Sequence, residues 1–247
     1  MALIVIPARY ASTRLPGKPL LDETGVPLVV HVLERARRAR RAERVVVATD
    51  DPRILEAVRA AGGEAVMTSS DHRSGTDRVA EAVRDLPGDV VVNLQGDEPD
   101  IDPDHVDALV DAVLSDESIA MATVAAPLDP GDATNENVVK VVLDRAGRAL
   151  YFSRSPLPFV RNAGAAVPLR HAGIYAFRRD ALLRFVSIAP TPLETTESLE
   201  QLRALESGMA IRVVVVDDVA PGIDTPADYA AFVKRRKNRE ARGTQDS

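Results

Sequence analysis

Three cations and several small residues gather in a loop that follows the first apolar run of the chain. The cations lie four to five residues apart, with two hydroxyl residues and a glycine among them: Arg9, Arg14 and Lys18, with Ser12, Thr13 and Gly17. Such a loop can hold a polyphosphate, because arginine grips two oxygens at once, lysine adds a point charge, and hydroxyl and backbone N–H groups fill the gaps. The alternative is a solvated basic loop. The preceding apolar run and the Pro-Gly-Lys ending favour anion binding.

Two carboxylate motifs elsewhere suit a phosphate-bound metal. The segment Gln95-Gly96-Asp97-Glu98-Pro99 follows a strongly apolar run, and Asp224 lies in Gly222-Ile223-Asp224-Thr225-Pro226. Mg²⁺ prefers one or two carboxylates together with substrate oxygens and water. We therefore expect Asp97 to bind Mg²⁺, with Glu98 in reserve, and Asp224 to be a second ligand. The alternatives are an ordinary turn for Asp97 and helix capping for Asp224.

The segment Asp71–Arg78 is dense in hydrogen-bonding groups. Ser74, Gly75 and Thr76 have the size and polarity to contact a base or a ribose. Thr76 could instead cap the helix that follows, and Asp77 and Arg78 could form an exposed ion pair of little energetic value.

Arg154 ends one predicted strand, and His171 lies near the start of another. Together they would suit an acidic acceptor, with the guanidinium as a bidentate clamp and the imidazole as a hydrogen-bond donor. The alternative for His171 is structural, which is the more common role of a lone histidine.

The elements that must position these residues alternate between strand and helix in the first half. Apolar runs predict strands over 2–6, 44–49, 64–67, 89–94 and 120–125, and helical spacing predicts helices over 28–40, 52–61, 77–85 and 103–114. This alternation is typical of a mostly parallel sheet with helices on both faces. In such sheets ligands bind at the carboxyl ends of the strands, where Arg9 and Asp97 would lie.

The second half changes character. Two strands over 138–143 and 149–153 flank a glycine turn and predict a hairpin. Further strands are expected over 169–177 and 211–216, and helices over 179–185 and 197–206. A last helix begins at Asp224-Thr225-Pro226 and ends in the basic segment Lys234–Arg242, where cations suit a helix C-terminus.

Composition excludes several classes of function. The 247 residues carry a net charge of −6, which disfavours a nucleic-acid binder, and contain no cysteine, which excludes disulfides and thiolate chemistry. The chain has no charged leader and no apolar run of membrane-spanning length, so we expect a cytoplasmic protein. It has no G-x-G-x-x-G motif, and Gly17-Lys18 is followed by Pro19, so a dinucleotide dehydrogenase and a Walker A ATPase are both disfavoured.

Taken together, the motifs resemble those of one family, the CTP:3-deoxy-manno-octulosonate (Kdo) cytidylyltransferases. The matching runs follow the family's order over nearly the whole chain: Ile6–Leu20 (IPARYASTRLPGKPL), Val47–Asp51 (VATDD), Met67–Arg78 (MTSSDHRSGTDR), Val92–Pro99 (VNLQGDEP), Val138–Asp144 (VVKVVLD), Ala149–Arg154 (ALYFSR), Arg170–Tyr175 (RHAGIY), Ser198–Leu205 (SLEQLRAL) and Ile223–Pro226 (IDTP).

The resemblance implies an α/β enzyme with a Rossmann-like, mostly parallel sheet flanked by helices. It implies a single nucleotidyltransferase domain over residues 1–247, in which 138–177 form a β-hairpin and mixed-sheet elaboration for the acceptor site and for dimerisation. The expected partners are CTP and a small acidic acceptor, the cofactor is Mg²⁺, and the assembly is a homodimer.

The resemblance also assigns roles to individual residues. The CTP phosphates would be held by Arg9, Ser12, Thr13, Arg14 and Lys18, and Ala8, Ser74, Gly75 and Arg78 would surround the nucleoside. Asp97 and Asp224 would bind Mg²⁺, and the acceptor would face Gln95, Arg154, His171 and Glu200. Arg9, Arg14, Lys18, Asp97 and Asp224 would carry catalysis, which here means positioning two anions for in-line attack and neutralising their charge.

The acceptor half departs from the family pattern. Phe159 and Glu206 stand where the family commonly has tryptophan, and the loop 160–168 is short. The default acceptor is Kdo, and a non-Kdo acid such as phosphonoformate or another phosphonate is the alternative. A non-catalytic nucleotide-binding module is a more distant one.

Overall fold

The computed structural model describes residues 1–11, 15–162, 164 and 166–243. Within them the strands are β1 (Ala2–Ala8), β2 (Ala42–Thr49), β3 (Glu64–Met67), β4 (Val90–Asn93), β5 (Met121–Pro127), β6 (Lys140–Leu143), β7 (Ala149–Ser153), β8 (Leu169–Arg178) and β9 (Ile211–Val215). The α-helices are α1 (Leu28–Ala36), α2 (Pro52–Ala60), α3 (Gly75–Ala82), α4 (Pro103–Leu114), α5 (Arg179–Ser187), α6 (Pro192–Glu197), α7 (Gln201–Glu206) and α8 (Pro226–Gly243). The expected strand-helix alternation is confirmed.

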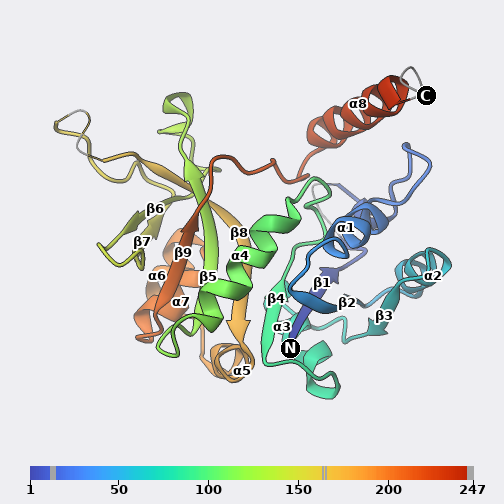
Figure 1. The fold of residues 1–247 in the computed structure, drawn as a ribbon, viewed down its shortest axis with the longest axis horizontal. Helices are drawn as coiled ribbons and strands as arrows, with labels where there is room; N and C mark the ends of the chain where they lie inside the picture. The colour runs from blue at the N-terminus through green and yellow to red at the C-terminus, as the bar shows by residue number, and fades with distance from the viewer. Residues whose placement is uncertain (12–14, 163, 165, 244–247) are drawn as a thin grey trace.

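These strands form one sheet in the order β3-β2-β1-β4-β8-β5-β9 (Figure 1). The pairs β3–β2, β2–β1, β1–β4 and β5–β9 are parallel, whereas β8 runs antiparallel to both of its neighbours, β4 and β5. The predicted mostly parallel sheet flanked by helices is therefore present. Because β8 lies between β4 and β5, residues from the second half of the chain lie beside the nucleotide-binding half.

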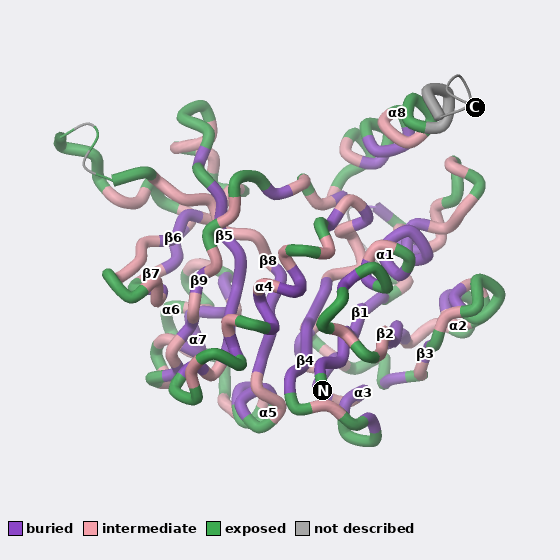
Figure 2. Tube along the Cα trace, viewed as in Figure 1, coloured by how far each residue is buried: buried purple, intermediate pink, exposed green. Residues whose placement is uncertain are grey.

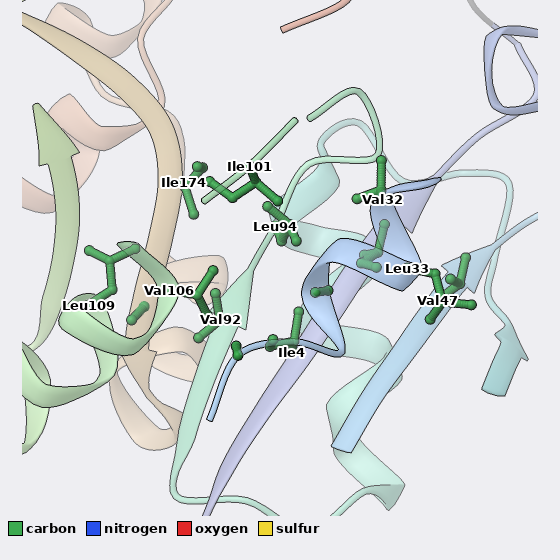
Figure 3. Packing of buried hydrophobic residues seen from close by; sticks show 14 of the residues in the cluster. Ile4, Val32, Leu33, Val47, Val92, Leu94, Ile101, Val106, Leu109 and Ile174 are labelled. Atoms are coloured by element: carbon green, nitrogen blue, oxygen red, sulfur yellow. The ribbon is translucent and has the colours of Figure 1, made fainter. Parts of the chain in front are cut away.

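Alternate side chains of β1 face opposite sides of the sheet and so begin two cores. Ile4 and Ile6 pack with α1, α2 and α4 on one face, and Leu3 and Val5 pack with α3, α5 and α7 on the other. Figure 3 shows the first of these cores, and Figure 2 shows the buried central strands between the two helical layers. A strand buried on both faces reads as a continuous apolar run, which explains the sequence signal at residues 2–6.

A third, smaller cluster fixes α8 against the loop that follows β1. Tyr229 and Phe232 of α8 pack with Leu15, Leu28 and Ile223. The hydroxyl of Tyr229 accepts a hydrogen bond from the backbone N–H of Glu23 at 3.0 Å. In Figure 1 α8 lies beside α1, near the end of the sheet where β1 terminates. The last helix of the chain thus borders the first loop.

The hairpin of β6 and β7 extends the far side of the sheet. Lys140 and Val141 of β6 pair antiparallel with Arg170 and Leu169 of β8, so the hairpin joins the strand that carries His171. Among the described residues no helix is both long and apolar enough to cross a membrane.

The predicted helix over 197–206 is wrong. The segment contains two helices, α6 and α7, separated by a break at Ser198, which has a left-handed backbone with φ of 52°. Helix α6 begins earlier, at Pro192. Its Thr191-Pro192-Leu193-Glu194 start is a capping-box pattern that the sequence analysis did not use.

Candidate active site

A cavity of about 280 Å³ opens at the carboxyl ends of β1 and β4. The chain leaves β1 toward β2 on one side and returns to β4 on the other, so this is the topological switch point where α/β sheets bind ligands. Predicted site residues that line it are Ala8, Arg9, Lys18, Ser74, Gly75, Arg78, Gln95, Asp97 and Asp224. The other three predicted phosphate contacts, Ser12, Thr13 and Arg14, lie outside the described residues.

The ammonium group of Lys18 joins both predicted metal ligands. Lys18 Nζ lies 2.8 Å from Asp97 Oδ2 and 3.6 Å from Asp224 Oδ1, and it donates to the carbonyl oxygen of Ile223 at 2.8 Å. Lys18 is 15% exposed. The three segments that sequence analysis connected only by chemical type therefore converge on one nitrogen atom.

Asp224 does not provide the helix cap that was its alternative role. The N-terminus of α8 is capped by Thr225, whose Oγ1 accepts from the backbone N–H of Asp228 at 3.2 Å. Asp228 returns the bond by accepting from the backbone N–H of Thr225 at 2.8 Å. Because this reciprocal pair makes the cap, the Asp224 carboxylate can extend toward Lys18.

Glu98 shows how much negative charge is concentrated here. Burial, together with the nearby charges of Asp97 and Asp224, raises the pKa of the Glu98 carboxyl to about 8. Its Oε2 is enclosed and has no hydrogen-bond partner in the described part of the chain. A cation bound at this point would relieve the repulsion among the three carboxyl groups.

The donor set of Asp97 and Asp224 fits a divalent cation that also binds phosphate. No cluster of three or more His, Asp or Glu side chains in the described ranges is arranged to hold a metal alone. Two carboxylates are what a cation such as Mg²⁺ takes from a protein when phosphate oxygens and water complete its shell. The remaining ligands would therefore come from the substrate.

The segment Asp71–Arg78, which is predicted to contact the nucleoside, is held in place by more contacts than its sequence suggested. Ser74, rather than Thr76, caps α3, since its side chain accepts from the backbone N–H of Asp77 at 3.1 Å. Arg78 is buried and pairs with Asp50 at 2.7 Å, so the predicted exposed pair of Asp77 and Arg78 is wrong. Arg78 contributes to the cavity wall with a charge already neutralised by a partner.

Two glycines let backbone segments approach each other at this edge. A Cβ atom on Gly96 would lie 2.8 Å from the carbonyl oxygen of Pro7, which is closer than real Cβ contacts allow. Gly17 has φ of +68°, and the ring of Tyr10 packs against it while the Arg53 guanidinium lies 3.6 Å from the centre of that ring. The loops after β1 and β4 thus lie close together, which brings Asp97 within reach of Lys18.

A second cavity, of about 1020 Å³, adjoins the first and shares Asp97 and Asp224 with it. It extends over β8 and the start of α7, and its lining combines the two arginines Arg154 and Arg170 with amides, His171 and several carboxylates. One ligand in each cavity would meet at the shared carboxylates. We call the first the nucleotide cavity and the second the acceptor cavity.

The Arg154 guanidinium is fixed in place but keeps two donors. Its Nε donates to the carbonyl oxygen of Glu197 at 2.8 Å, Nη1 to that of Glu136 at 2.8 Å, and Nη2 to that of Ser198 at 3.4 Å. A guanidinium has five N–H groups, so one remains on each terminal nitrogen with no partner in the described residues. Two such N–H groups form the fork that binds a carboxylate bidentately.

His171 is neutral, and its predicted role toward the acceptor stays a prediction. Burial between Phe152 and Tyr175 lowers the pKa of the His171 imidazole to about 3. Thr123 gives its hydroxyl proton to the carbonyl oxygen of Ile174 at 2.8 Å, so its oxygen accepts from His171 Nε2 at 2.9 Å. That network assigns the proton to Nε2 and leaves Nδ1 as an acceptor.

Two predicted acceptor residues lie elsewhere. Gln95 lines the nucleotide cavity, and Glu200 accepts a hydrogen bond from Thr76, on the nucleoside side, at 2.7 Å. The neighbour of Glu200, Gln201, lines the acceptor cavity, and its buried Nε2 has no hydrogen-bond partner in the described chain. Sequence analysis missed Gln201 although it lies inside a quoted motif, because a glutamine on a helix carries no signal of its own. The acceptor roles of Gln95 and Glu200 stay predictions.

The cytidylyltransferase family model matches residues 3–211, and the chain belongs to this family. A 3-deoxy-manno-octulosonate cytidylyltransferase of Escherichia coli is 49% identical over 226 residues, which cover 92% of each chain. The enzyme of that name from Syntrophobacter fumaroxidans is 52% identical over 235 residues, covering 93% of this chain and 94% of its own. A solved CMP:2-keto-3-deoxy-manno-octonic acid synthetase complexed with CTP has a TM-score of 0.93 and 46% identity, covering 96% of this chain and 99% of its own.

The neutral state of His171 predicts a loss of stability in acid. Its folded-state pKa lies below the ordinary value of 6.5, so the unfolded chain takes up the proton first and the fold loses stability as pH falls from 6.5 toward 3. The slope from this residue reaches about 1.4 kcal/mol per pH unit. Urea unfolding between pH 7 and pH 4 should show a shallower dependence for His171→Gln than for the wild-type protein. His105→Gln, on α4, is the control, and equal slopes for wild type and His171→Gln would contradict the assignment.

Proposed function

We propose that the protein transfers CMP from CTP to 3-deoxy-manno-octulosonate with release of pyrophosphate. One observation carries the proposal: the nucleotide cavity and the acceptor cavity meet at Asp97 and Asp224, next to Lys18. A nucleotide in the first cavity and an acid in the second would place their reacting groups at this junction. The names of relatives about half identical over the full chain support both substrates.

The reaction joins two anions, so charge and distance are the obstacles. An acceptor hydroxyl oxygen attacks the α-phosphorus in line, the bond from that phosphorus to the pyrophosphate oxygen breaks, and the hydroxyl proton is released. Arg9 and Lys18 would neutralise the CTP phosphates, together with Ser12, Thr13 and Arg14. Arg154 would hold the acceptor carboxylate with its two remaining N–H groups. The surrounding side chains thus orient both reactants without themselves forming a bond to either.

Asp97 and Asp224 are the residues that would hold Mg²⁺. The cation would add positive charge to the phosphate oxygens and so reduce the repulsion that the acceptor meets. The enclosed Glu98 carboxyl, whose pKa is raised partly by these two aspartates, supports a cation at this place.

The acceptor cavity supports Kdo over a small phosphonate. Of the two residues that depart from the family pattern, Phe159 is 86% exposed and Glu206 accepts from the backbone N–H of Leu193 at 3.1 Å. Neither lines the acceptor cavity as the described residues define it. These two substitutions therefore give no reason for a different substrate, and about 1020 Å³ is ample for an eight-carbon sugar acid.

Pyrophosphate release with CTP, Mg²⁺ and a panel of acids tests the proposal. We expect turnover with Kdo and at least tenfold lower kcat/KM with phosphonoformate, because a small acid cannot use the width of the cavity. UTP in place of CTP is the nucleotide control. A phosphonate that outperforms Kdo would overturn the acceptor assignment, and CTP binding without turnover of any acid would indicate a non-catalytic module.

Asp97→Asn and Asp224→Asn should each lower Mg²⁺-dependent turnover by about 100- to 1000-fold, because each removes one charged ligand from the cation. Asp102→Asn is the matched control, since Asp102 caps α4 nearby and asparagine caps equally well. Melting temperatures should show that all three variants fold. A rate close to wild type in either test variant would remove that residue from the metal site.

We also propose a homodimer formed through residues 138–177. Large apolar side chains are exposed on this elaboration, including Leu150 at 61%, Phe159 at 86% and Val167 at 68%. Large exposed apolar side chains on one elaboration are typical of an interaction surface. Light scattering should give twice the chain mass for the wild type and a lower mass for Leu150→Ser combined with Phe159→Ser; a monomeric wild type would exclude the dimer. The cytoplasmic location expected from the sequence stays a prediction.

A further inference from the structure

A chain of buried hydrogen bonds runs behind the two cavities. Gln95 Nε2 donates to Asn93 Oδ1 at 2.8 Å, Asn93 Nδ2 donates to Thr76 Oγ1 at 3.1 Å, and Thr76 Oγ1 donates to Glu200 Oε2 at 2.7 Å. Asn93 is 0% exposed and Thr76 is 2% exposed. Neither side chain lines a cavity, so neither is placed to touch a substrate.

The chemistry of the four side chains determines which group donates and which accepts in each of these hydrogen bonds. A threonine hydroxyl has one proton, and a carboxylate is acceptor-only, so Thr76 must donate to Glu200 and accept from Asn93. Asn93 therefore turns its amino group to Thr76 and its oxygen to Gln95. Each side chain can make its hydrogen bonds in only one orientation. The hydrogen-bond chain therefore holds the four side chains in one arrangement.

The chain connects the walls of the two cavities. Thr76 lies in the first turn of α3, directly after Ser74 and Gly75 of the nucleotide cavity. Glu200 lies between Leu199 and Gln201, which both line the acceptor cavity. The bond from Thr76 to Glu200 joins residues 124 positions apart in sequence, so it is a direct contact between the two walls.

A cation lies on the far side of Glu200. Arg203 Nη2 lies 4.0 Å from Glu200 Oε1, and the Arg203 guanidinium is held by Glu194 through bonds of 2.8 Å and 2.5 Å. Arg203 is 7% exposed. The carboxylate that accepts the hydrogen bond from Thr76 therefore lies next to a guanidinium that is itself fixed between α6 and α7.

We propose that Thr76 and Asn93 are positioning residues that set the separation between the CTP α-phosphate and the acceptor. The proposal rests on the proposed function, because it concerns the same transfer. The rate of in-line attack falls steeply as the distance between the two reacting atoms grows, and a misplacement of about 1 Å lowers the rate on the order of 100-fold. Loss of the chain should therefore lower kcat, whereas each substrate keeps its own contacts and its own KM.

The test compares Thr76→Val with Thr76→Ser in steady-state kinetics with CTP and Kdo. Valine has the shape of threonine but no hydroxyl, and we expect kcat to fall by about 10- to 100-fold with both KM values within about threefold of wild type. Serine restores the hydroxyl and should return kcat to within about threefold. Thr49→Val is the control, because Thr49 is also buried, on β2, and its hydroxyl accepts from the backbone N–H of Asp51, two residues away.

Several outcomes would overturn the proposal. These are a normal kcat in Thr76→Val, an equal loss of kcat in Thr49→Val at a matched melting temperature, or a failure of Thr76→Ser to recover. If Thr76→Val does not fold, Asn93→Asp serves instead, since an ionised aspartate cannot donate to Thr76; it should lower kcat with little change in KM, and unchanged kcat would overturn the proposal. A wild-type protein without activity would count against the proposed function, whereas an active wild type with an unaffected variant counts against this inference alone.

Discussion

The contact on which this structure depends most is the one between the Lys18 ammonium and the carboxylates of Asp97 and Asp224. It joins the first loop, the loop after β4 and the start of α8, and Lys18 bonds to Ile223, 205 residues away. Burial, and after it the charges of the two aspartates, raises the pKa of Glu98, so a cation between the aspartates reduces the repulsion at this point. The lysine therefore holds together the two carboxylates that we propose as the metal ligands. The small cluster of α8 residues around Leu15 and Ile223 supports the same junction with apolar contacts.

The antiparallel strand β8 decides where the second substrate site lies. It pairs with β4 at Asn93↔Tyr175 and with β5 at Ala125↔His171. A strand-helix alternation alone would have placed another parallel strand next to β4 and left the acceptor residues at a distance. Because β8 returns through the middle of the sheet, His171 and Arg170 lie beside the carboxylates that end the nucleotide cavity. The topology thus creates the shared junction.

Much of this arrangement was predictable because its signals are local. The strands Glu64–Met67 and Ala149–Ser153 and the helix Pro103–Leu114 have the predicted bounds, since apolar runs, proline starts and glycine stops mark them. The rule that ligands bind at strand ends predicted the place of Asp97, whereas Asp224 was connected to it only by its chemical type.

Long-range partners explain what the sequence could not reveal. The proton of His171 is placed by Thr123 on another strand, the charge of Arg78 is met by Asp50, and Glu200 turns toward Thr76. The left-handed residue Ser198, which ends α6, has no glycine or asparagine to mark it. Such features depend on tertiary contacts rather than on a local pattern.

The acceptor cavity contains both hydrogen-bond donors and hydrogen-bond acceptors. Arg154 has two N–H groups to give, the Nε2 of Gln201 has a donor without a protein partner among the described residues, and neutral His171 retains only an acceptor at Nδ1. A phosphonate at neutral pH presents almost only acceptors, so it would offer no hydrogen-bond donor to His171, which lines the cavity. A sugar acid offers a carboxylate to Arg154 and hydroxyl groups that both donate and accept.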